Sequence, residues 1–314
     1  MRKLLWLTAA ALLAAGCSSA SGREAAAENV PDPRPLGGAL HFTAAESAAL
    51  HRAEEQGVKR CMESRGLDYS VVPGGDARRT ATASPYGLLT RGRAAQDGYG
   101  LTVQRLKKPP ADPNAQRVSA LSERARRAWD EALKGAPDGP REEIALKDGP
   151  TVSVPTDSCV AVARRALYGA SWERSYYTLQ HVSNAIVRDT LDHALVRAAE
   201  RKWAACMRDE GFRYRHREDP LKALRQRLDS AGSDTAALRA AGKEELRIAV
   251  RDAACQAEAG LAEQVLRAQK EVEKALPRAR TAVLKDLRTA RQAALSRAAR
   301  ETPVSNLADK GRTT

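Results

Sequence analysis

A nine-residue pattern occurs twice in the chain, and it constrains the fold more than any other feature. Cys, Met, Gly and Tyr stand at the same offsets in residues 61–69 and 206–214. Glycine adopts a left-handed backbone conformation at little cost, which the position just after a helix often requires. Each copy therefore predicts a helix that ends at Gly66 or Gly211 and carries a cysteine on its last turns. Because Cys and Met are rare in this chain, we infer one structural unit used twice rather than a chance similarity.

Each copy is followed by a second cysteine with an aspartate shortly before it. Cys159 follows the first copy and Cys255 the second. Four cysteines can pair in three ways, among which sequence alone does not choose, but the shared order favours Cys61 with Cys159 and Cys206 with Cys255. Each bridge would close a long loop and contribute about 3–5 kcal/mol in the chain-entropy description. A metal site is disfavoured, because no two of these cysteines are close in sequence and no histidine lies beside them at ligand spacing.

The start of the chain has the features of an export signal. A short positive segment is followed by the apolar run 4–15 and then by small residues, and this run is too short to span a bilayer. Residues 12–17 resemble a bacterial lipoprotein signal, which implies that Cys17 is diacylated and becomes the first mature residue. The alternative is an ordinary cleaved signal with an incidental cysteine. We expect an exported protein, lipid-anchored on the outer face of the cytoplasmic membrane, where disulfides persist.

Composition favours a helical fold. Aromatic residues make up only 4% of the chain, and apolar residues make up 43%. An alanine- and arginine-rich chain with few β-branched runs favours helix nearly throughout. We expect a mainly α fold of two disulfide-stapled helical units, with long amphipathic helices and a loop-rich insertion in the first. The expected segments are a signal peptide (1–16), a lipid-anchored flexible tether (17–42), a first unit (43–170), a second unit (171–302) and a disordered tail (303–314).

The first unit is expected to begin with a helix at the capping-box signature Thr43 to Glu46. Glycine and proline clusters predict turns and loops in residues 71–118. The remaining expected elements are the end of the first helix near Arg65, a helix over 119–134, a short strand or extended segment over 151–154, and a helix from Cys159 to about Tyr168.

The second unit is expected to contain longer helices. Nothing in residues 171–210 breaks a helix, and Asp219-Pro220 predicts a restart. Residues 230–233 predict a turn, and Gly242 a second break. From Lys243 the pattern predicts uninterrupted helix up to Pro277, which should kink or split it. An apolar stripe with steps of three and four residues runs through that proline. Its members are Leu261, Val265, Ala268, Val272, Leu276, Ala279, Val283, Leu287, Ala290 and Ala294.

Several short blocks are similar to a group of uncharacterised secreted lipoproteins of actinomycetes. That group carries a CMR-x-x-G element and a later D-x-x-C element followed by Gly-Leu. Here the matching blocks are residues 206–211, residues 252–255 with Gly260-Leu261, Pro85-Tyr86-Gly87 and Gly98-Tyr99-Gly100. The resemblance implies an exported location, paired cysteines and a helical fold, and it brings no known activity.

The chain carries no motif that names a reaction. The five histidines form no His-Glu-x-x-His pattern and no close pair, and no nucleophile elbow or phosphate-binding loop occurs in a strand–helix context. Paired acids such as Glu54-Glu55 are common on charged helix faces, although a hydrolase uses such pairs. We therefore expect no catalytic residue, no metal and no cofactor. A secreted hydrolase without a recognisable motif is the more distant alternative.

The excess of basic over acidic residues in the chain indicates anionic partners. The formal net charge is +13, and removal of the signal peptide with Arg2 and Lys3 would leave +11. For an exported protein we expect no nucleic acid, so anionic lipid or phosphate-bearing wall polymer are the available polyanions. Our main hypothesis is a non-catalytic binding or scaffolding lipoprotein with an unknown partner. The alternative is electrostatic binding through a basic C-terminal helix. In the competing hypothesis the apolar stripe of that helix is a surface for a protein partner or packs on the helix predicted over residues 171–210, and packing is favoured. The basic residues of the C-terminal helix are Arg278, Arg280, Lys285, Arg288, Arg291, Arg297 and Arg300.

Overall fold

The computed structural model describes residues 30–78, 83–107 and 111–301. The expected signal peptide, Cys17 and the expected tail over 303–314 lie outside these residues.

The described chain is mainly helical, as predicted. It contains one small antiparallel hairpin, in which β1 pairs with β2 from Arg141 opposite Pro155 to Ala145 opposite Thr151. The elements in order are η1 (Pro35–Gly38), α1 (Ala44–Ser64), α3 (Arg91–Asp97), α4 (Leu101–Leu106), α5 (Ala115–Ser119), α6 (Glu123–Lys134), β1 (Arg141–Ala145), β2 (Thr151–Pro155), α7 (Cys159–Tyr168), α8 (Trp172–Leu191), α9 (Ala194–Asp209), α10 (Asp219–Ala231), α11 (Thr235–Glu258), α12 (Leu261–Lys274), η2 (Arg278–Arg280) and α13 (Leu284–Glu301).

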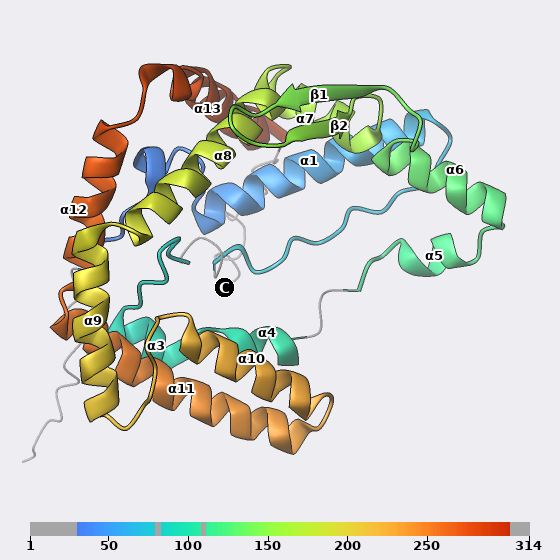
Figure 1. Ribbon diagram of the computed structural model, residues 1–314. Coiled ribbons are helices and arrows are strands. Elements are labelled where there is room, and N and C mark those ends of the chain that lie inside the picture. The colour runs from blue at the N-terminus through green and yellow to red at the C-terminus, as the bar shows by residue number, and fades with distance from the viewer. Residues whose placement is uncertain (1–29, 79–82, 108–110, 302–314) are drawn as a thin grey trace, which may run out of the picture.

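The helices form an open, C-shaped arrangement in the view of Figure 1. One limb contains α1, α7, α8, α13 and the hairpin, the back contains α9 and α12, and the other limb contains α3, α4, α10 and α11. The buried side chains form separate clusters along this arch. One lies between α1, α8 and α13, and another surrounds the contact of α9 with α11.

Both copies of the repeated pattern end their helices in the same way. Gly66 has a φ of 71° and Gly211 a φ of 87°, in the left-handed region. In each copy the glycine and the residue after it donate N–H bonds back to the last turn, which is the Schellman arrangement. These bonds run from Gly66 to Glu63 O (2.9 Å), Leu67 to Met62 O (3.0 Å), Gly211 to Arg208 O (3.0 Å) and Phe212 to Met207 O (2.8 Å).

A glutamate in each copy fixes the chain that leaves the helix. Glu55 Oε2 accepts hydrogen bonds from Val72 N–H at 2.8 Å and from the Tyr69 hydroxyl at 2.9 Å. Glu200 Oε1 accepts from Arg217 N–H at 3.2 Å. In both copies the donor N–H lies 17 residues after the glutamate. The two units therefore share this contact as well as the helix end.

The two disulfides follow the pairing that the order of the repeats favours. Cys61 on α1 is bonded to Cys159 on α7, with Cα atoms 5.4 Å apart. Cys206 on α9 is bonded to Cys255 on α11, with Cα atoms 5.6 Å apart. Each bridge thus joins the helix that carries the repeated pattern to the helix that carries the later cysteine.

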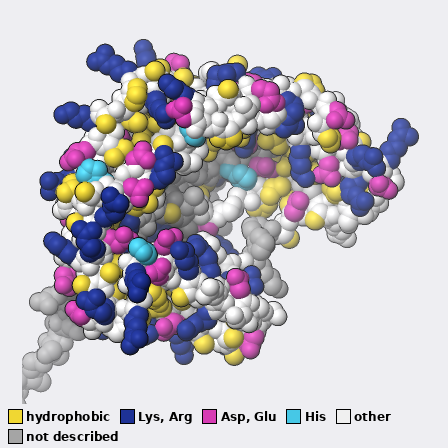
Figure 2. Space-filling model, in the orientation of Figure 1, with side chains coloured by type: hydrophobic (Ala, Val, Ile, Leu, Met, Phe, Trp, Pro, Cys, Tyr) yellow, Lys and Arg dark blue, Asp and Glu magenta, His cyan; other side chains and the backbone are white. Residues whose placement is uncertain are grey.

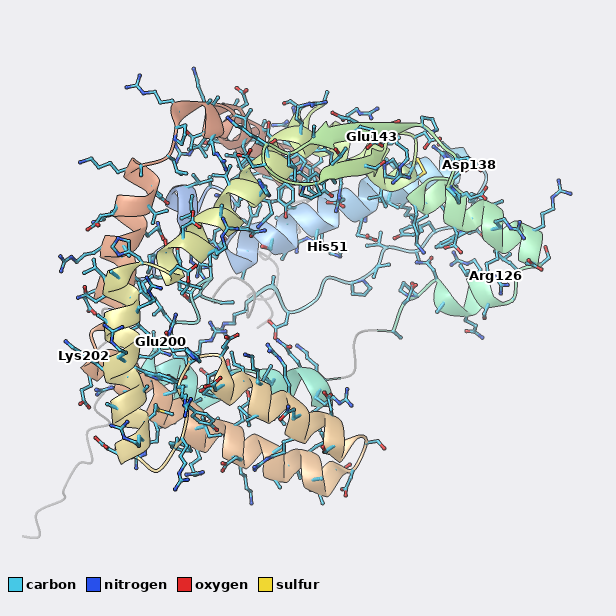
Figure 3. All side chains as sticks on the ribbon, viewed as in Figure 1. His51, Arg126, Asp138, Glu143, Glu200 and Lys202 are labelled. Carbon is cyan, nitrogen blue, oxygen red and sulfur yellow. A yellow bond between two sulfur atoms is a disulfide. The ribbon has the colours of Figure 1, made fainter. Side chains whose placement is uncertain are left out.

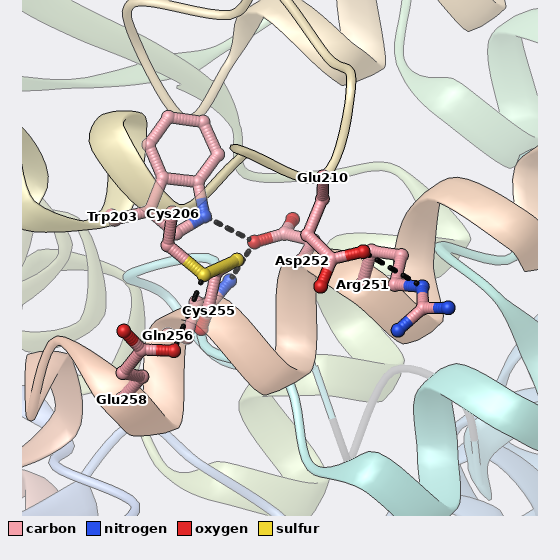
Figure 4. The surroundings of a disulfide bond; sticks show 8 residues. All are labelled: Trp203, Cys206, Glu210, Arg251, Asp252, Cys255, Gln256 and Glu258. Carbon is pink, nitrogen blue, oxygen red and sulfur yellow. Dashed lines mark hydrogen bonds and ion pairs between the residues drawn. A yellow bond between two sulfur atoms is a disulfide. The ribbon is translucent and has the colours of Figure 1, made fainter. Parts of the chain in front are cut away.

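Asp252, three residues before Cys255, is the centre of a buried polar network (Figure 4). It accepts hydrogen bonds from Trp203 Nε1 at 2.7 Å and from Gln256 Nε2 at 2.9 Å. The Tyr99 hydroxyl donates to its other oxygen at 2.6 Å. Asp252 and the Gly98-Tyr99-Gly100 block therefore join the insertion to α11.

Glycine allows α1 and α7 to approach closely. A Cβ at Gly57 would lie 2.9 Å from Ala163 Cβ, whereas a Cβ at Gly92 on α3 would meet nothing within 4 Å. We expect Gly57→Val to lower the free energy of unfolding by about 1–3 kcal/mol through overpacking, as measured by urea denaturation. Gly92→Val is the control, since it adds the same atoms in open space. Equal denaturation midpoints for the two variants would contradict this explanation.

The prediction of one unbroken helix over residues 171–210 is wrong. The α8 helix ends at Leu191 and α9 begins at Ala194, with Asp192 and His193 between them. His193 has an extended conformation, and its Nδ1 accepts a hydrogen bond from Leu195 N–H at 3.3 Å. The histidine therefore caps α9 and lets the chain change direction.

The expected breaks after residue 240 are also corrected. Gly242 lies inside α11, where a Cβ would approach Thr102 Cγ2 to 3.0 Å, so this glycine serves packing. The break falls instead at Gly260, whose φ of 61° is left-handed. The expected split at Pro277 is confirmed, because α12 ends at Lys274 and a short 3-10 helix follows the proline.

The described part of the expected tether, residues 30–42, and the insertion are more ordered than predicted. Leu36 and Ala39 are only 6% and 4% exposed, and Leu36 N–H donates to Glu273 Oε1 at 2.8 Å. Residues 30–42 therefore pack on the body, because their apolar side chains find partners on α8, α12 and α13. The region 71–118 contains α3, α4 and α5 rather than loops alone.

The expected boundary between residues 170 and 171 does not separate two packed bodies. The α3 and α4 helices from the first predicted unit pack on α11, and α13 from the second packs on α1 and α7. The observed helix boundaries elsewhere lie close to the predicted ones. The α6 helix begins at Glu123 and is capped by Ser122, and α1 begins after the predicted capping box.

Candidate functional site

An open groove of about 890 Å³ lies between α9 and the segment that follows it. We call it the arginine groove, because five arginines line it together with one acidic residue. The lining residues are Arg197, Glu200, Arg201, Ala204, Ala205 and Arg208 from α9, and Gly211, Arg213, Tyr214, Arg215 and His216 from the segment.

The amphipathic pattern of α9 turns its arginines outward. Val196, Ala199, Trp203 and Met207 form its buried face, at helical spacing. Because these side chains are fixed in the core, the opposite face of the helix must point to solvent. Glu200 and Lys202 lie on opposite sides of α9 (Figure 3).

The other wall of the groove is held by backbone contacts. Gly211 reverses the chain at the end of α9. Asp219 Oδ2 then accepts hydrogen bonds from Arg215 N–H at 2.9 Å and from His216 N–H at 2.8 Å. Burial opposes ionisation of Asp219, but these two backbone bonds outweigh it and hold its pKa below the usual value. The wall is therefore fixed by its backbone, and its arginine side chains remain exposed.

None of the five groove arginines forms an ion pair with a carboxylate in the part of the chain that the structure describes. All five are exposed, and Figure 2 shows Lys and Arg side chains gathered over α9. Guanidinium groups without carboxylate partners, set in a groove, attract and bind anions.

The single acid of the groove does not neutralise these arginines. Glu200 accepts the Arg217 N–H described above, and its carboxylate lies 3.8 Å from Arg217 Nε and 3.9 Å from His216 Nδ1. Arg217 itself is buried behind the wall and donates to Tyr86 O at 2.6 Å. Burial lowers the pKa of Arg217, and the nearby Glu200 opposes that shift.

The first copy of the repeat provides an internal comparison. Equivalent positions differ by 145 residues (206 minus 61). The framework residues are the same in both copies: Glu, Cys, Met, Gly and Tyr. Four of the five groove positions differ, and only Arg197 has an arginine, Arg52, at its equivalent: the five positions carry a charge of +5 in the second copy and −1 in the first. The first-copy residues are Arg52, Gln56, Glu63, Asp68 and Ser70. The shared fold therefore does not require the arginines.

The predicted basic helix is used largely for packing. Arg291 forms an ion pair with Glu46 at 2.9 Å, and Arg280 pairs with Asp148. Arg288 and Arg297 donate to Leu36 O at 3.3 Å and to Leu167 O at 2.6 Å. The remaining predicted residues, Arg278, Lys285 and Arg300, are exposed. Leu287 and Ala294 of the apolar stripe are fully buried.

Other grooves are less clearly suited to one kind of ligand. A groove of about 610 Å³ lies beside His51, whose Nε2 is 2.9 Å from Val72 O. A third, of about 560 Å³, is lined by four acids, two arginines and one histidine, among them Arg217 and Asp252. Neither gathers charge of one sign as the arginine groove does.

Within residues 30–78, 83–107 and 111–301 no group of three His, Cys, Asp or Glu side chains is placed to hold a metal ion. No helix of this described part is long and apolar enough to cross a membrane.

The arginine groove was not predicted from the sequence. Its signal is present in the spacing of Arg197, Arg201 and Arg208, which places them on one helix face. Arg213 and Arg215 lie two and four residues after the repeated glycine. Comparing the two copies position by position would have found the change from mixed residues to arginine.

Comparison of the chain with protein-family models, with curated proteins and with solved structures finds no match.

Proposed function

We propose that this is an exported, lipid-anchored, non-catalytic binding protein of the cell envelope, which binds an anionic ligand in the arginine groove. The observation that carries the proposal is the set of five exposed arginines in one groove without carboxylate partners in the described chain. The comparison with the first copy supports it, since the same framework there carries a charge of −1 at the five equivalent positions.

The location rests on separate support. Two disulfides suit an oxidising compartment outside the cytoplasm, and the lipoprotein-like signal would attach Cys17 to the membrane. A binding role suits a rigid, stapled scaffold with an open groove better than catalysis does. In the described residues no histidine is hydrogen-bonded to a serine, threonine or cysteine side chain.

The groove is favoured over the basic C-terminal helix as the binding surface. Four of the seven predicted residues of that helix already bind carboxylates or carbonyls of the protein. Their charges are therefore partly satisfied within the molecule, whereas those of the groove remain free to bind a ligand.

Removal of three groove charges tests the proposal. We expect R201Q/R208Q/R213Q to weaken binding of fluorescein-labelled polyphosphate by about 100-fold, taking roughly 1 kcal/mol for each charge. Fluorescence anisotropy of the purified mature protein in non-ionic detergent measures this affinity. The thermal unfolding temperature should not change, because all three side chains are exposed.

A matched variant removes three exposed charges from η2 and α13. We expect R278Q/K285Q/R300Q to bind polyphosphate within about twofold of the unmodified protein, apart from the general loss of net charge. If this variant loses as much affinity as the groove variant, or if binding is insensitive to salt, the groove is not the site.

A further inference from the structure

We infer that the ligand of the arginine groove is a linear phosphodiester polymer lying along α9, with a polyol or sugar between successive phosphates. This inference rests on the proposed function and adds the shape and chemistry of the ligand.

The arginines on α9 form a row. Arg197, Arg201 and Arg208 lie within about 40° of one another around the helix axis, since each residue turns the helix by about 100°. Along the axis they are separated by about 6 Å and about 10 Å, giving a row about 16 Å long. A site for one small anion would converge its donors on a single point. A row of this length fits several anionic groups carried by one extended chain.

The floor of the groove suits the uncharged part of such a chain. Ala204 and Ala205 occupy the gap between Arg201 and Arg208, and Gly211 lies at the opposite wall. These small side chains leave room for a carbon backbone between two charged ends. Glu200 adds a hydrogen-bond acceptor at the end of the groove that carries Arg197 and Arg201, which suits the hydroxyl groups of a polyol or sugar.

Phosphodiesters match the donors in spacing and geometry. Each repeat presents one charge and two non-bridging oxygens, which a guanidinium binds with two parallel N–H bonds. A short polyol between phosphates gives a repeat close to the one-turn spacing of Arg197 and Arg201. Arg213 and Arg215 face the same space from the second wall, so adjacent phosphates are contacted from both sides.

The concave shape disfavours a membrane surface as the ligand. The lining residues face one another across the groove from α9 and from residues 211–216. A planar bilayer would touch only the rim of such a groove, whereas a single polymer chain enters it.

A length series of synthetic glycerol-phosphate oligomers tests the inference. With one, two, three, four and six phosphates, we expect affinity to rise roughly fivefold per phosphate up to three or four, and slowly afterwards. The slope of log affinity against log salt should be about −0.7 for each phosphate bound, and so near −2 for the trimer. Isothermal titration calorimetry of the mature protein in detergent gives both quantities.

Single substitutions at the ends of the row locate the polymer. We expect R208Q to weaken binding of the tetramer by roughly fivefold and of the dimer by less than twofold, because a dimer can occupy Arg197 and Arg201 alone. R278Q, in η2, should leave both affinities unchanged.

The outcomes separate this inference from the proposed function. If glycerol phosphate monomer binds as tightly as the tetramer, the groove is a single-anion site: the polymer inference fails and the proposed function stands. If no oligomer and no polyphosphate binds, both fail. Tighter groove-dependent binding of phosphatidylglycerol vesicles would also overturn the polymer inference.

Discussion

Replacement of Cys61 and Cys159 by serine should lower the free energy of unfolding by about 4–5 kcal/mol. The bridge spans 98 residues, and in the chain-entropy description a loop of that length restricts the unfolded chain by about this amount. Domains are stable by only about 5–15 kcal/mol, so this loss would leave the variant close to unfolding. Urea denaturation followed by circular dichroism measures the change.

The second bridge is the comparison for the first. It spans 49 residues, and because the entropy depends on the logarithm of loop length, its removal should cost about 0.6 kcal/mol less. A serine pair at 61 and 159 that denatures at the same urea concentration as the unmodified protein would contradict the prediction. A larger loss at 206 and 255 would mean that local packing, and not loop length, controls the contribution.

Features that depend on neighbours in sequence were predictable. Each repeated helix is followed by a glycine, Gly66 or Gly211. The residue type alone predicted the left-handed backbone conformation observed at both positions. The Thr43–Glu46 capping box formed as expected, with Glu46 N–H donating to Thr43 Oγ1 at 3.2 Å. The cysteine pairing followed from the order of two similar segments, because a duplicated fold brings equivalent residues together.

Features that depend on distant partners were not predictable. The short helix α4 exists because Glu245, far along the chain, accepts the N–H groups of Leu101 and Thr102 at 2.8 Å. Nothing near α4 in sequence supplies those acceptors. The break at His193 also depends on tertiary structure. Its side chain takes the place of a helical acceptor for Leu195 N–H because α9 packs in a new direction.

The candidate site was missed because arginine is common throughout the chain. The sequence contains 52 Lys and Arg residues, so a local gathering of arginines in the sequence does not by itself mark a binding site. Whether an arginine is free for a ligand depends on its partners. Arg291 has Glu46 beside it, whereas Arg201 has no carboxylate partner in the described structure. That difference arises from tertiary structure.

Substitution of Asp252 by alanine should cost about 3–5 kcal/mol. Asp252 is 1% exposed and accepts hydrogen bonds from Tyr99, Trp203 and Gln256. Truncation leaves those donors in the interior without an acceptor, and each unsatisfied group costs about 1–3 kcal/mol. The loss should be seen as a lower urea midpoint, with the segment around Tyr99 released from α11 in hydrogen-exchange measurements. An unchanged urea midpoint for the variant would contradict the assigned role of this network.

Asparagine at the same position separates the hydrogen bonds from the charge. In D252N the amide oxygen can accept from Trp203 and Gln256, and the amide nitrogen can donate to the Tyr99 oxygen, so we expect a loss below about 1 kcal/mol at low pH. Burial raises the pKa of Asp252 above its ordinary value of 3.8, against the opposing effect of its hydrogen bonds. A raised folded-state pKa means that the unmodified protein loses stability as pH rises from 3.8 through that raised value, while D252N does not. Over this pH interval the urea midpoint of D252N should therefore rise relative to that of the unmodified protein. At higher pH the difference between the two midpoints should stay constant. A difference that does not vary with pH would show that the three donors fully compensate the buried charge.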